Sequence, residues 1–318
     1  SMVTFLVRRL LFMIPVALLV SFVTFMIIHL IPGDPARVLL GESATPQTVA
    51  ALHHQLGLDK PLLTQYVLWL GQALHGNLGQ SIQLQQPVTQ AILQRLPVTA
   101  ELGVISLIVS VALAIPLGVL AAGTRNTPID WLINVLSLIG TAIPNFVLGL
   151  LLILFLAVVI RPFPPGGYVP FTQDPLANLR DLVLPVITLA AGAVAGNLRQ
   201  VRASMIEVLS QDYIRTARAK GLRRGRVYFV HGLRNALLPL LTIVGLQAGA
   251  ILGGAVIIES IFLWPGVGLL AIQSILSKDY PVVQGVVLLS ALSYMLVNLL
   301  VDVGYGALDP RISLRSGH

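Results

Sequence analysis

The residues best suited to charged contacts stand in one basic segment, residues 206–235, between two long apolar stretches. From Glu207 to Arg234 its acidic residues are Glu207 and Asp212, and its cations are Arg215, Arg218, Lys220, Arg223, Arg224, Arg226 and Arg234. Cytoplasmic loops of membrane proteins are basic as a class. Charge alone therefore does not distinguish a contact surface from an ordinary loop.

The order of residue types inside the basic segment predicts a helix, a turn and a second helix. At a period of 3.6 residues, one side of the first helix collects Leu209, Tyr213, Thr216, Ala217 and Lys220, and another collects Gln211, Arg215, Arg218 and Leu222. A face of small residues would thus adjoin a cationic face. Gly221 would end this helix, because glycine adopts positive φ at no steric cost, and Gly225 would permit a second turn.

Stretches that could span a membrane flank this segment. The 318 residues are 56% hydrophobic and 10% charged, with a mean hydropathy of +0.87, which indicates an integral membrane protein. Six stretches are long enough to cross a bilayer, which takes about 20 apolar residues: Leu10–Ile31, Val98–Ala122, Trp131–Ile160, Leu182–Val201, Ala236–Ile258 and Val282–Val301. We expect an all-α protein with six transmembrane helices. We take Met2 as the natural start and expect no cleavable signal.

The chain divides into three expected parts: residues 2–31 with the first span, an extracytoplasmic insert at 32–97, and a transmembrane core at 98–318. In the insert, Thr45-Pro46 is a typical helix start, and a second helix should run from Lys60 to about Leu74. Thr127-Pro128 should begin the third span in the same way. That span is too long to be straight, and Pro144 predicts either a kink in it or an end at the membrane interface.

Placing the N-terminus in the cytoplasm puts most of the 20 Lys and Arg residues on the inner side, including the basic segment and Arg311 and Arg315. Both termini would then be cytoplasmic. Because the positive charge has this explanation and no basic stripe alternates with aromatic residues, we expect no nucleic-acid binding.

Polar residues at membrane depth are candidates for function, because they are costly there. Asn145 and Gln247 lie deepest and should face a cavity or a partner helix, whereas Glu259 and Asp302 lie near span ends, where partial hydration would accommodate their charge. We take Asn145, Gln247 and Glu259 as candidates for a translocation pathway.

The remaining chemistry is limited. His53, His54 and His75 lack a carboxylate or Cys at ligand spacing, so we expect no metal site. Ser21, Ser106, Ser137 and His29 form no recognisable catalytic arrangement, so we expect no enzyme. No phosphate-binding G-x-x-x-x-G-K-[ST] loop and no chain of buried carboxylates occurs in the sequence. Energy for uphill transport would therefore come from outside this chain.

Several motifs carry a family resemblance. Tyr213-Ile-Arg-Thr-Ala-Arg-Ala-Lys-Gly-Leu222 followed by Arg234-Asn-Ala-Leu-Leu-Pro239 resembles the cytoplasmic coupling loop of bacterial ABC-importer permeases. The interval after Gly221 is longer than in the general consensus and is similar to the peptide-importer branch. Leu30-Ile-Pro-Gly-Asp-Pro35, Asp279-Tyr-Pro-Val-Val-Gln-Gly285 and Leu308-Asp-Pro-Arg311 resemble the dipeptide, oligopeptide and nickel permeases of that branch, in particular the first of the two permeases.

The resemblance implies a type I ABC importer permease fold in the bacterial inner membrane, with a coupling helix between spans four and five. It implies a second homologous permease, two ABC ATPases that bind ATP and Mg²⁺, and an extracytoplasmic solute-binding protein, with no cofactor on this chain. The implied coupling residues are Gln211, Asp212, Tyr213, Arg215, Ala217, Arg218, Lys220, Gly221, Leu222 and Arg223. Short peptides are the expected solute, with glutathione or a nickel chelate as alternatives, and a self-sufficient channel or secondary carrier is the rival from another class.

Overall fold

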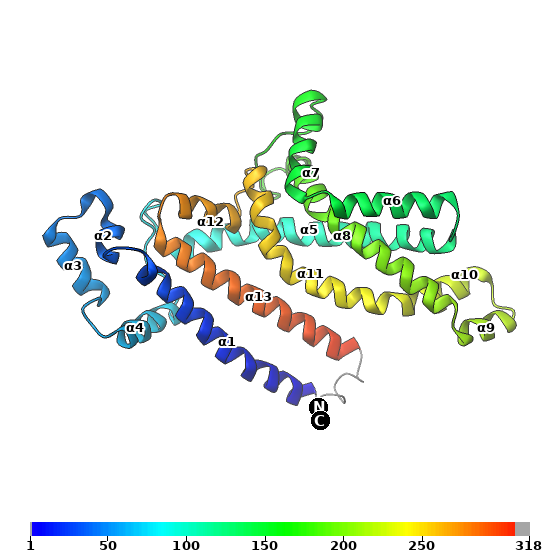
Figure 1. The fold of residues 1–318 in the computed structure, drawn as a ribbon, viewed down its shortest axis with the longest axis horizontal. Helices are drawn as coiled ribbons and strands as arrows, with labels where there is room; N and C mark the ends of the chain where they lie inside the picture. Colours follow the sequence, from blue (N-terminus) through cyan, green and yellow to red (C-terminus); the bar gives the residue numbers. More distant parts are fainter. Residues whose placement is uncertain (1, 309–318) are drawn as a thin grey trace. The chain divides into compact units, whose positions relative to one another are not determined.

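The computed structural model describes residues 2–308, which fold into α-helices joined by turns (Figure 1). The predicted Leu308-Asp-Pro-Arg311 tail, with Arg311 and Arg315, extends outside the described residues. Contacts divide the chain into two compact units, Ser1–Val98 with Gly266–His318, and Thr99–Pro265. This division is by contacts, whereas the expected parts 2–31, 32–97 and 98–318 are defined by their place relative to the membrane and stay predictions.

In the first unit, α1 (Met2–Leu30) packs along α13 (Tyr280–Leu308). Near the start of α13, the side-chain nitrogen Nε2 of Gln284 donates to the backbone oxygens of Thr24 and Phe25, at 3.1 and 3.3 Å. Nearer the other end of the pair, Nε of Arg9 donates to Oδ2 of Asp302 at 2.6 Å. Polar bonds thus fix the register of the two long helices at two distant points.

The predicted insert is helical. It contains α2 (Pro35–Leu40), a 3₁₀ turn (Gly41–Ser43), α3 (Pro46–Leu56) and α4 (Leu62–Leu74). Thr45 caps α3 as predicted, because its hydroxyl accepts the backbone N–H of Thr48, and Gly57 ends the helix in the left-handed conformation. Aromatic packing of Phe25 against Tyr66, with ring centroids 5.5 Å apart, joins α4 to α1.

A buried carboxylate ties the end of the insert to α13. Oδ2 of Asp279 accepts the hydroxyl of Ser81 at 2.5 Å, and the two carboxylate oxygens accept the backbone N–H groups of Ile82 and Gln83, each at 3.2 Å. Asp279 is 1% exposed. Next to this contact, α5 (Val88–Gly123) begins ten residues before the predicted span start at Val98, because its first turns pack into an apolar cluster with α12 (Val267–Leu276) and α13.

In the second unit, the third predicted span is broken. Helices α6 (Pro128–Ala142) and α7 (Asn145–Leu152) meet at 100°, and α7 continues as a π-helical segment (Ile153–Val159). The predicted kink at Pro144 is confirmed, and its cause is local, since Ile143 is extended (ψ 121°) as the residue before a proline prefers to be. Thr127 caps α6 as predicted.

The long helices α8 (Pro175–Leu209) and α11 (Arg234–Ile261) form the centre of this unit. Val201 and Met205 of α8 pack on Ala236 and Leu240 of α11. Gly118 of α5 permits a close approach, because a Cβ there would lie 2.6 Å from Cβ of Val201. Such small-residue contacts are how helices associate in lipid, where burial of apolar surface gives no net gain.

Five helices of the described residues are long and apolar enough to cross a bilayer, or six if α6 and α7 count as one bent span. Their outer surfaces carry exposed large side chains, among them Leu11 and Phe12 of α1 and Trp131 of α6. Exposed apolar side chains in this number suit contact with lipid. The protein is therefore an integral membrane protein, as predicted.

Candidate functional site

The basic segment contains a short helix, α9 (Asp212–Ala219), between the end of α8 and a helical turn, α10 (Arg224–Arg226). From α10 the chain continues through a π-helical segment (Val227–Leu233) into α11. The predicted order of helix, turn and helix is confirmed. Gln211 precedes α9 in an extended conformation, and Asp212 occupies the first helical turn, where a negative charge is favourable.

A small apolar cluster holds α9 to its own chain. Ile214 is fully buried, Ala217 is 9% exposed, and both pack with Val227, which is 2% exposed. Leu209 and Leu222 cover the edge of this cluster. Ile214 was not among the predicted site residues, although its spacing of three residues from Ala217 is the helical signal that marks a shared face.

The rest of α9 is exposed. The side chains of Asp212 and Arg215 are 95% and 78% exposed, and the closest of their charged atoms lie 3.7 Å apart. Tyr213 is 44% exposed, and its hydroxyl accepts a hydrogen bond from Nδ2 of Asn235 at 3.2 Å. Gln211, Arg218, Lys220, Gly221 and Arg223 are exposed as well. The helix thus offers an aromatic ring among charges of predominantly positive sign.

Gly221 ends α9 as predicted, with φ at +75°. Its N–H donates to the carbonyl of Arg218, and the N–H of Leu222 donates to the carbonyl of Ala217. An added Cβ at Gly221 would meet no atom within 4 Å. A substitution at Gly221 is therefore restricted by the backbone conformation and not by contact with other atoms of the chain.

Two expectations for this segment need correction. Gly225 does not form a second turn, because it lies inside α10, and the chain instead turns between Gly221 and Arg223. The exposed small-residue face predicted for α9 is also incomplete, because Ala217 packs inward with Ile214. A period of 3.6 identifies faces of a helix, but it does not say which face the rest of the chain covers.

The three pathway candidates, Asn145, Gln247 and Glu259, lie apart in the second unit. Gln247 of α11 faces α8, where its amide exchanges two hydrogen bonds of 3.0 Å with the amide of Asn197. Asn145 begins α7 and is exposed, and a Cβ on Gly192 of α8 would lie 3.7 Å from its Oδ1. Glu259 follows Gln247 by twelve residues, about 18 Å along the same helix.

The expected hydration of Glu259 is wrong. Its side chain is 0% exposed, and its Oε1 accepts the hydroxyl of Thr99 at 2.6 Å. The position of Glu259 near the end of a span predicted that water would reach its carboxylate. Segments distant in sequence cover this carboxylate instead. Asp302, by contrast, keeps a side chain that is 22% exposed and forms an ion pair with Arg9.

A further buried ion pair was not predicted. Asp130 of α6, which is 3% exposed, accepts two hydrogen bonds from Arg202 of α8, at 2.6 Å from Nε and 2.8 Å from Nη2. The side chain of Asn134 donates to the same carboxylate at 2.7 Å. Nothing in the sequence indicated this pair, because Asp130 and Arg202 lie 72 residues apart on different helices.

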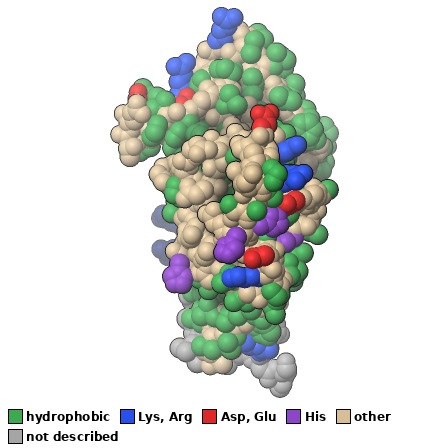
Figure 2. Space-filling view, turned by 90° about the vertical axis from the view of Figure 1, so that its left-hand side faces the viewer, with side chains coloured by type: hydrophobic (Ala, Val, Ile, Leu, Met, Phe, Trp, Pro, Cys, Tyr) green, Lys and Arg blue, Asp and Glu red, His purple; other side chains and the backbone are tan. Residues whose placement is uncertain are grey.

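The histidines do not gather into a metal site within the described residues, where no group of three or more potential ligands occurs. Nε2 of His53 instead lies 2.7 Å from Oδ1 of Asp34, the residue that caps α2. The hydrogen bond from His53, followed by the backbone N–H of Ala36, lowers the pKa of Asp34 below its usual value. Figure 2 shows histidine and charges of both signs mixed over the surface at the insert end.

Comparison with known proteins identifies relatives over the whole chain. The family described as "Binding-protein-dependent transport system inner membrane component" matches residues 114–314, and its N-terminal counterpart, "Binding-prot-dependent transport system membrane comp, N-term", matches residues 2–103.

Individual relatives are similar over almost their full length. The chain is 42% identical over 311 residues to a "Putative peptide transport system permease protein" of Brucella suis biovar 1 (strain 1330). It is 42% identical over 335 residues to the "Dipeptide transport system permease protein DppB" of Escherichia coli (strain K12), and 40% over 314 residues to the "Oligopeptide transport system permease protein AppB" of Bacillus subtilis (strain 168). Each alignment covers 98% of this chain and 99% of the relative.

Proposed function

Because the chain belongs to the family of binding-protein-dependent transport system inner membrane components, we propose that it is the permease subunit of an ATP-driven importer of short peptides. Three relatives that align over 98% of the chain bear names of peptide, dipeptide or oligopeptide permeases, which supports peptides as the solute. The chain itself is a transport subunit without catalysis, and ATP with Mg²⁺ binds to partner subunits.

The observation that carries the proposal is the construction of α9. Ile214 and Ala217 fix this helix to its own chain through a buried cluster, while Tyr213, Arg215 and Arg218 remain exposed on it. A rigidly anchored helix with an exposed aromatic and cationic surface is suited to docking against another protein, because aromatic and Arg residues supply most of the energy of such contacts.

The partners follow from this arrangement. An ABC ATPase contacts the coupling residues of this segment, which are Gln211, Asp212, Tyr213, Arg215, Arg218, Lys220, Gly221, Leu222 and Arg223. Ala217 packs in the buried cluster that holds their helix in place. Two such ATPases, a second homologous permease and an extracytoplasmic solute-binding protein complete the importer. The basic segment and both termini face the cytoplasm, which agrees with the excess of Lys and Arg on that side of membrane proteins.

Transport then proceeds by alternating access. Closure of the ATPase pair moves α9, and α8 and α11 transmit this movement because α9 is joined to both through short turns and the cluster at Val227. The spans change from inward-facing to outward-facing, and the solute enters between the two permeases. Asn145, Gln247 and Glu259 remain our candidates for residues along that pathway.

The test is substitution at Gly221. In the assembled importer, Gly221→Trp should abolish peptide-stimulated ATP hydrolysis and uptake, because the ring would project from the exposed end of α9 toward the ATPase. The side chain can leave the backbone without a clash at its first atom, since no atom lies within 4 Å of an added Cβ. Insertion into the membrane should therefore persist.

The matched control is Gly221→Ala, which carries the same cost of positive φ, about 1 kcal/mol, without the bulk. It should retain most of the uptake. Normal peptide-stimulated uptake by Gly221→Trp, or equal loss in both variants, would contradict coupling through this surface.

A further inference from the structure

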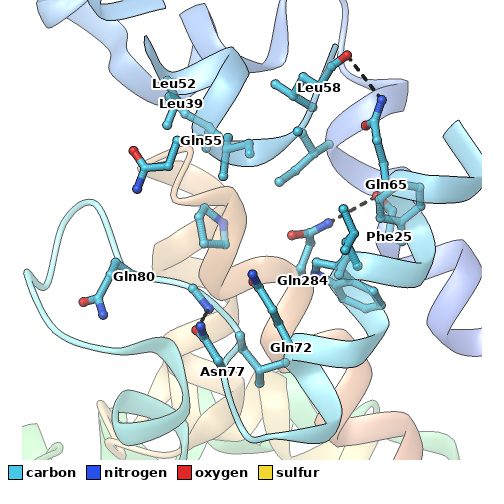
Figure 3. Close-up of a pocket in the computed structure, with 18 of the residues that line it drawn as sticks. Phe25, Leu39, Leu52, Gln55, Leu58, Gln65, Gln72, Asn77, Gln80 and Gln284 are labelled. Atoms are coloured by element: carbon cyan, nitrogen blue, oxygen red, sulfur yellow. Dashed lines mark hydrogen bonds between the residues drawn. The ribbon is translucent and has the colours of Figure 1, made fainter. Parts of the chain in front are cut away.

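A cavity of about 650 Å³ lies within the unit Ser1–Val98 with Gly266–His318. The end of α1, the helices α3 and α4, the segment 77–82 and the start of α13 enclose it (Figure 3). Its volume falls within the range of about 300–1,000 Å³ that is usual for small-molecule sites. It is distinct from the coupling surface on α9, which belongs to the other unit.

The lining of this cavity combines amides with apolar groups. Its amide side chains are those of Gln55, Gln65, Gln72, Asn77, Gln80 and Gln284. Phe25, Trp69 and leucines of the insert supply apolar surface, Lys60 supplies a positive charge, and the lining residues include no Asp or Glu. A lipid acyl chain would leave the amides without partners, which is costly. The lining therefore favours an occupant that carries both amide groups and apolar groups.

Gln284 presents a fixed hydrogen-bond acceptor to this cavity. The residue is 6% exposed, and its Nε2 is held by the backbone oxygens of Thr24 and Phe25. Its Oε1 has no hydrogen-bond partner among the described residues and lies on the cavity side of the amide (Figure 3). Because the nitrogen is anchored, the amide cannot turn to offer a donor instead. An occupant at this point must supply a hydrogen-bond donor, such as a peptide N–H group.

Gln72 of α4 adds an amide that is free to adapt. Figure 3 shows its side chain directed toward the same space as Gln284, while Gln55 and Gln80 lie at the margin. No hydrogen bond is formed by the side chain of Gln72 within the described residues, whereas Gln65 is fully engaged with His29 and with the carbonyls of Leu58 and Lys60. A free amide can pair with both the N–H and the C=O of one peptide unit.

We propose that this cavity binds the main chain of a short peptide. The peptide N–H groups donate to Oε1 of Gln284, the amide of Gln72 pairs with an adjacent peptide unit, apolar side chains pack on Phe25 and Trp69, and the terminal carboxylate is attracted to Lys60. The choice of peptide as ligand rests on the proposed function, and the location of the site rests on the lining described above.

The experiment measures binding to the full chain in lipid nanodiscs without the ATPases or the solute-binding protein. The probe is Ala-Ala-Ala, titrated by calorimetry, and its comparison is the same tripeptide methylated on both peptide nitrogens. The unmodified tripeptide should bind, and the methylated one should bind at least tenfold more weakly, because it cannot donate to Gln284. Equal binding of the two peptides, or no binding of either, would overturn the proposal.

Substitution then locates the site. Gln72→Ala should weaken binding of Ala-Ala-Ala about threefold to tenfold, the usual range for one hydrogen bond. Gln47→Ala is the matched control, because Gln47 is an exposed insert glutamine outside the cavity lining. The chain has three tryptophans, and a fluorescence change on binding should disappear in Trp69→Phe and persist in Trp131→Phe. Unchanged affinity in Gln72→Ala, or a signal that survives Trp69→Phe, would place the ligand elsewhere and reject the site.

Failure here can be told apart from failure of the proposed function. Peptide uptake by the assembled importer without any tripeptide binding to the isolated chain would reject the cavity and leave the importer function intact. Absence of peptide uptake by the assembled importer would reject peptides as the solute whatever the binding result, and with them the chosen ligand.

Discussion

Helix α9 and the amide-lined cavity show two ways of presenting polar groups. On α9, flexible charged side chains project from a helix that a few buried apolar residues hold in place. In the cavity, the polar groups are mainly neutral amides with one positive charge at Lys60, and the amide of Gln284 is fixed by backbone carbonyls of a neighbouring helix. The first arrangement suits a broad protein surface of opposite charge, and the second suits a small ligand that must be oriented.

If this comparison is correct, each region can be disrupted without the other. The supports lie in different units, Asp279 and Gln284 in one and Ile214 and Val227 in the other. Substitutions at these supports should therefore separate tripeptide binding from ATPase binding.

The largest effect is expected from Asp279→Ala. It leaves the hydroxyl of Ser81 and the N–H groups of Ile82 and Gln83 without their buried acceptor, which should reduce the free energy of unfolding by about 4 kcal/mol. Binding of Ala-Ala-Ala should be lost with it, because the segment 79–82 lines the cavity. Denaturant unfolding and calorimetry of the chain in nanodiscs measure both quantities.

The control for Asp279→Ala is Asp59→Ala, at an exposed aspartate of the insert, which should leave stability and binding almost unchanged. ATPase binding should be retained in both variants. Loss of ATPase binding in Asp279→Ala alone would mean that the two regions are not independent.

The converse change is Ile214→Ala. Removing this fully buried side chain should cost about 3 kcal/mol of local stability, because it opens the cluster that anchors α9. ATPase binding, followed by surface plasmon resonance on nanodiscs, should weaken at least tenfold, while affinity for Ala-Ala-Ala stays the same. Thr216→Ala, at an exposed position of the same helix, is the matched control. Wild-type ATPase affinity in Ile214→Ala would refute the anchoring role.

A smaller effect should distinguish the charged surface of α9 from the amide-lined cavity. Raising the ionic strength from 0.1 to 1 M shortens the Debye length from about 10 to about 3 Å. ATPase affinity should fall about threefold to tenfold, because exposed Arg215, Arg218 and Lys220 make the contact. The affinity for Ala-Ala-Ala should fall less, by no more than about twofold to threefold, because Lys60 alone attracts its carboxylate and the other contacts are with amides and apolar groups. Equal salt dependence of the two equilibria would contradict the comparison.

The smallest effect concerns the insert that borders the cavity. The pKa of Asp34 is lowered mainly by its hydrogen bond with His53, so its ionised form stabilises the fold above the unfolded-state pKa near 3.8. That contribution is lost as the pH falls from about 3.8 through the lower folded-state pKa. The advantage of the wild type over Asp34→Asn in thermal unfolding should therefore decline only below about pH 4, and an advantage that persists unchanged at pH 2 would contradict this assignment.

Local signals in the sequence predicted several features correctly. The caps Thr45 and Thr127, the kink at Pro144 and the end of α9 at Gly221 each depend on the conformational preferences of one or two residues. Such preferences act wherever the residue stands, so the sequence alone reveals them.

Features that depend on distant segments could not be predicted in this way. The early start of α5 and the burial of Glu259 are set by residues far along the chain. The inward packing of Ala217 involves only residues 209–227, but it depends on which face of α9 Val227 covers. The cavity depends on distant segments even more clearly, because its lining residues are spread between Phe25 and Gln284. No single stretch of the sequence contains a pattern that would predict it. The roles of the coupling and pathway residues remain predictions for experiment.

The pairing of Asp130 with Arg202 has a consequence for biogenesis. Synthesis proceeds from the N-terminus, so the carboxylate emerges from the ribosome 72 residues before its guanidinium. Until then the carboxylate stands without its cation in the first turn of α6, directly before the apolar stretch that begins at Trp131. The contact that joins α6 to α8 can therefore form only after Arg202 has been synthesised, so the bent α6 and α7 gain this support late.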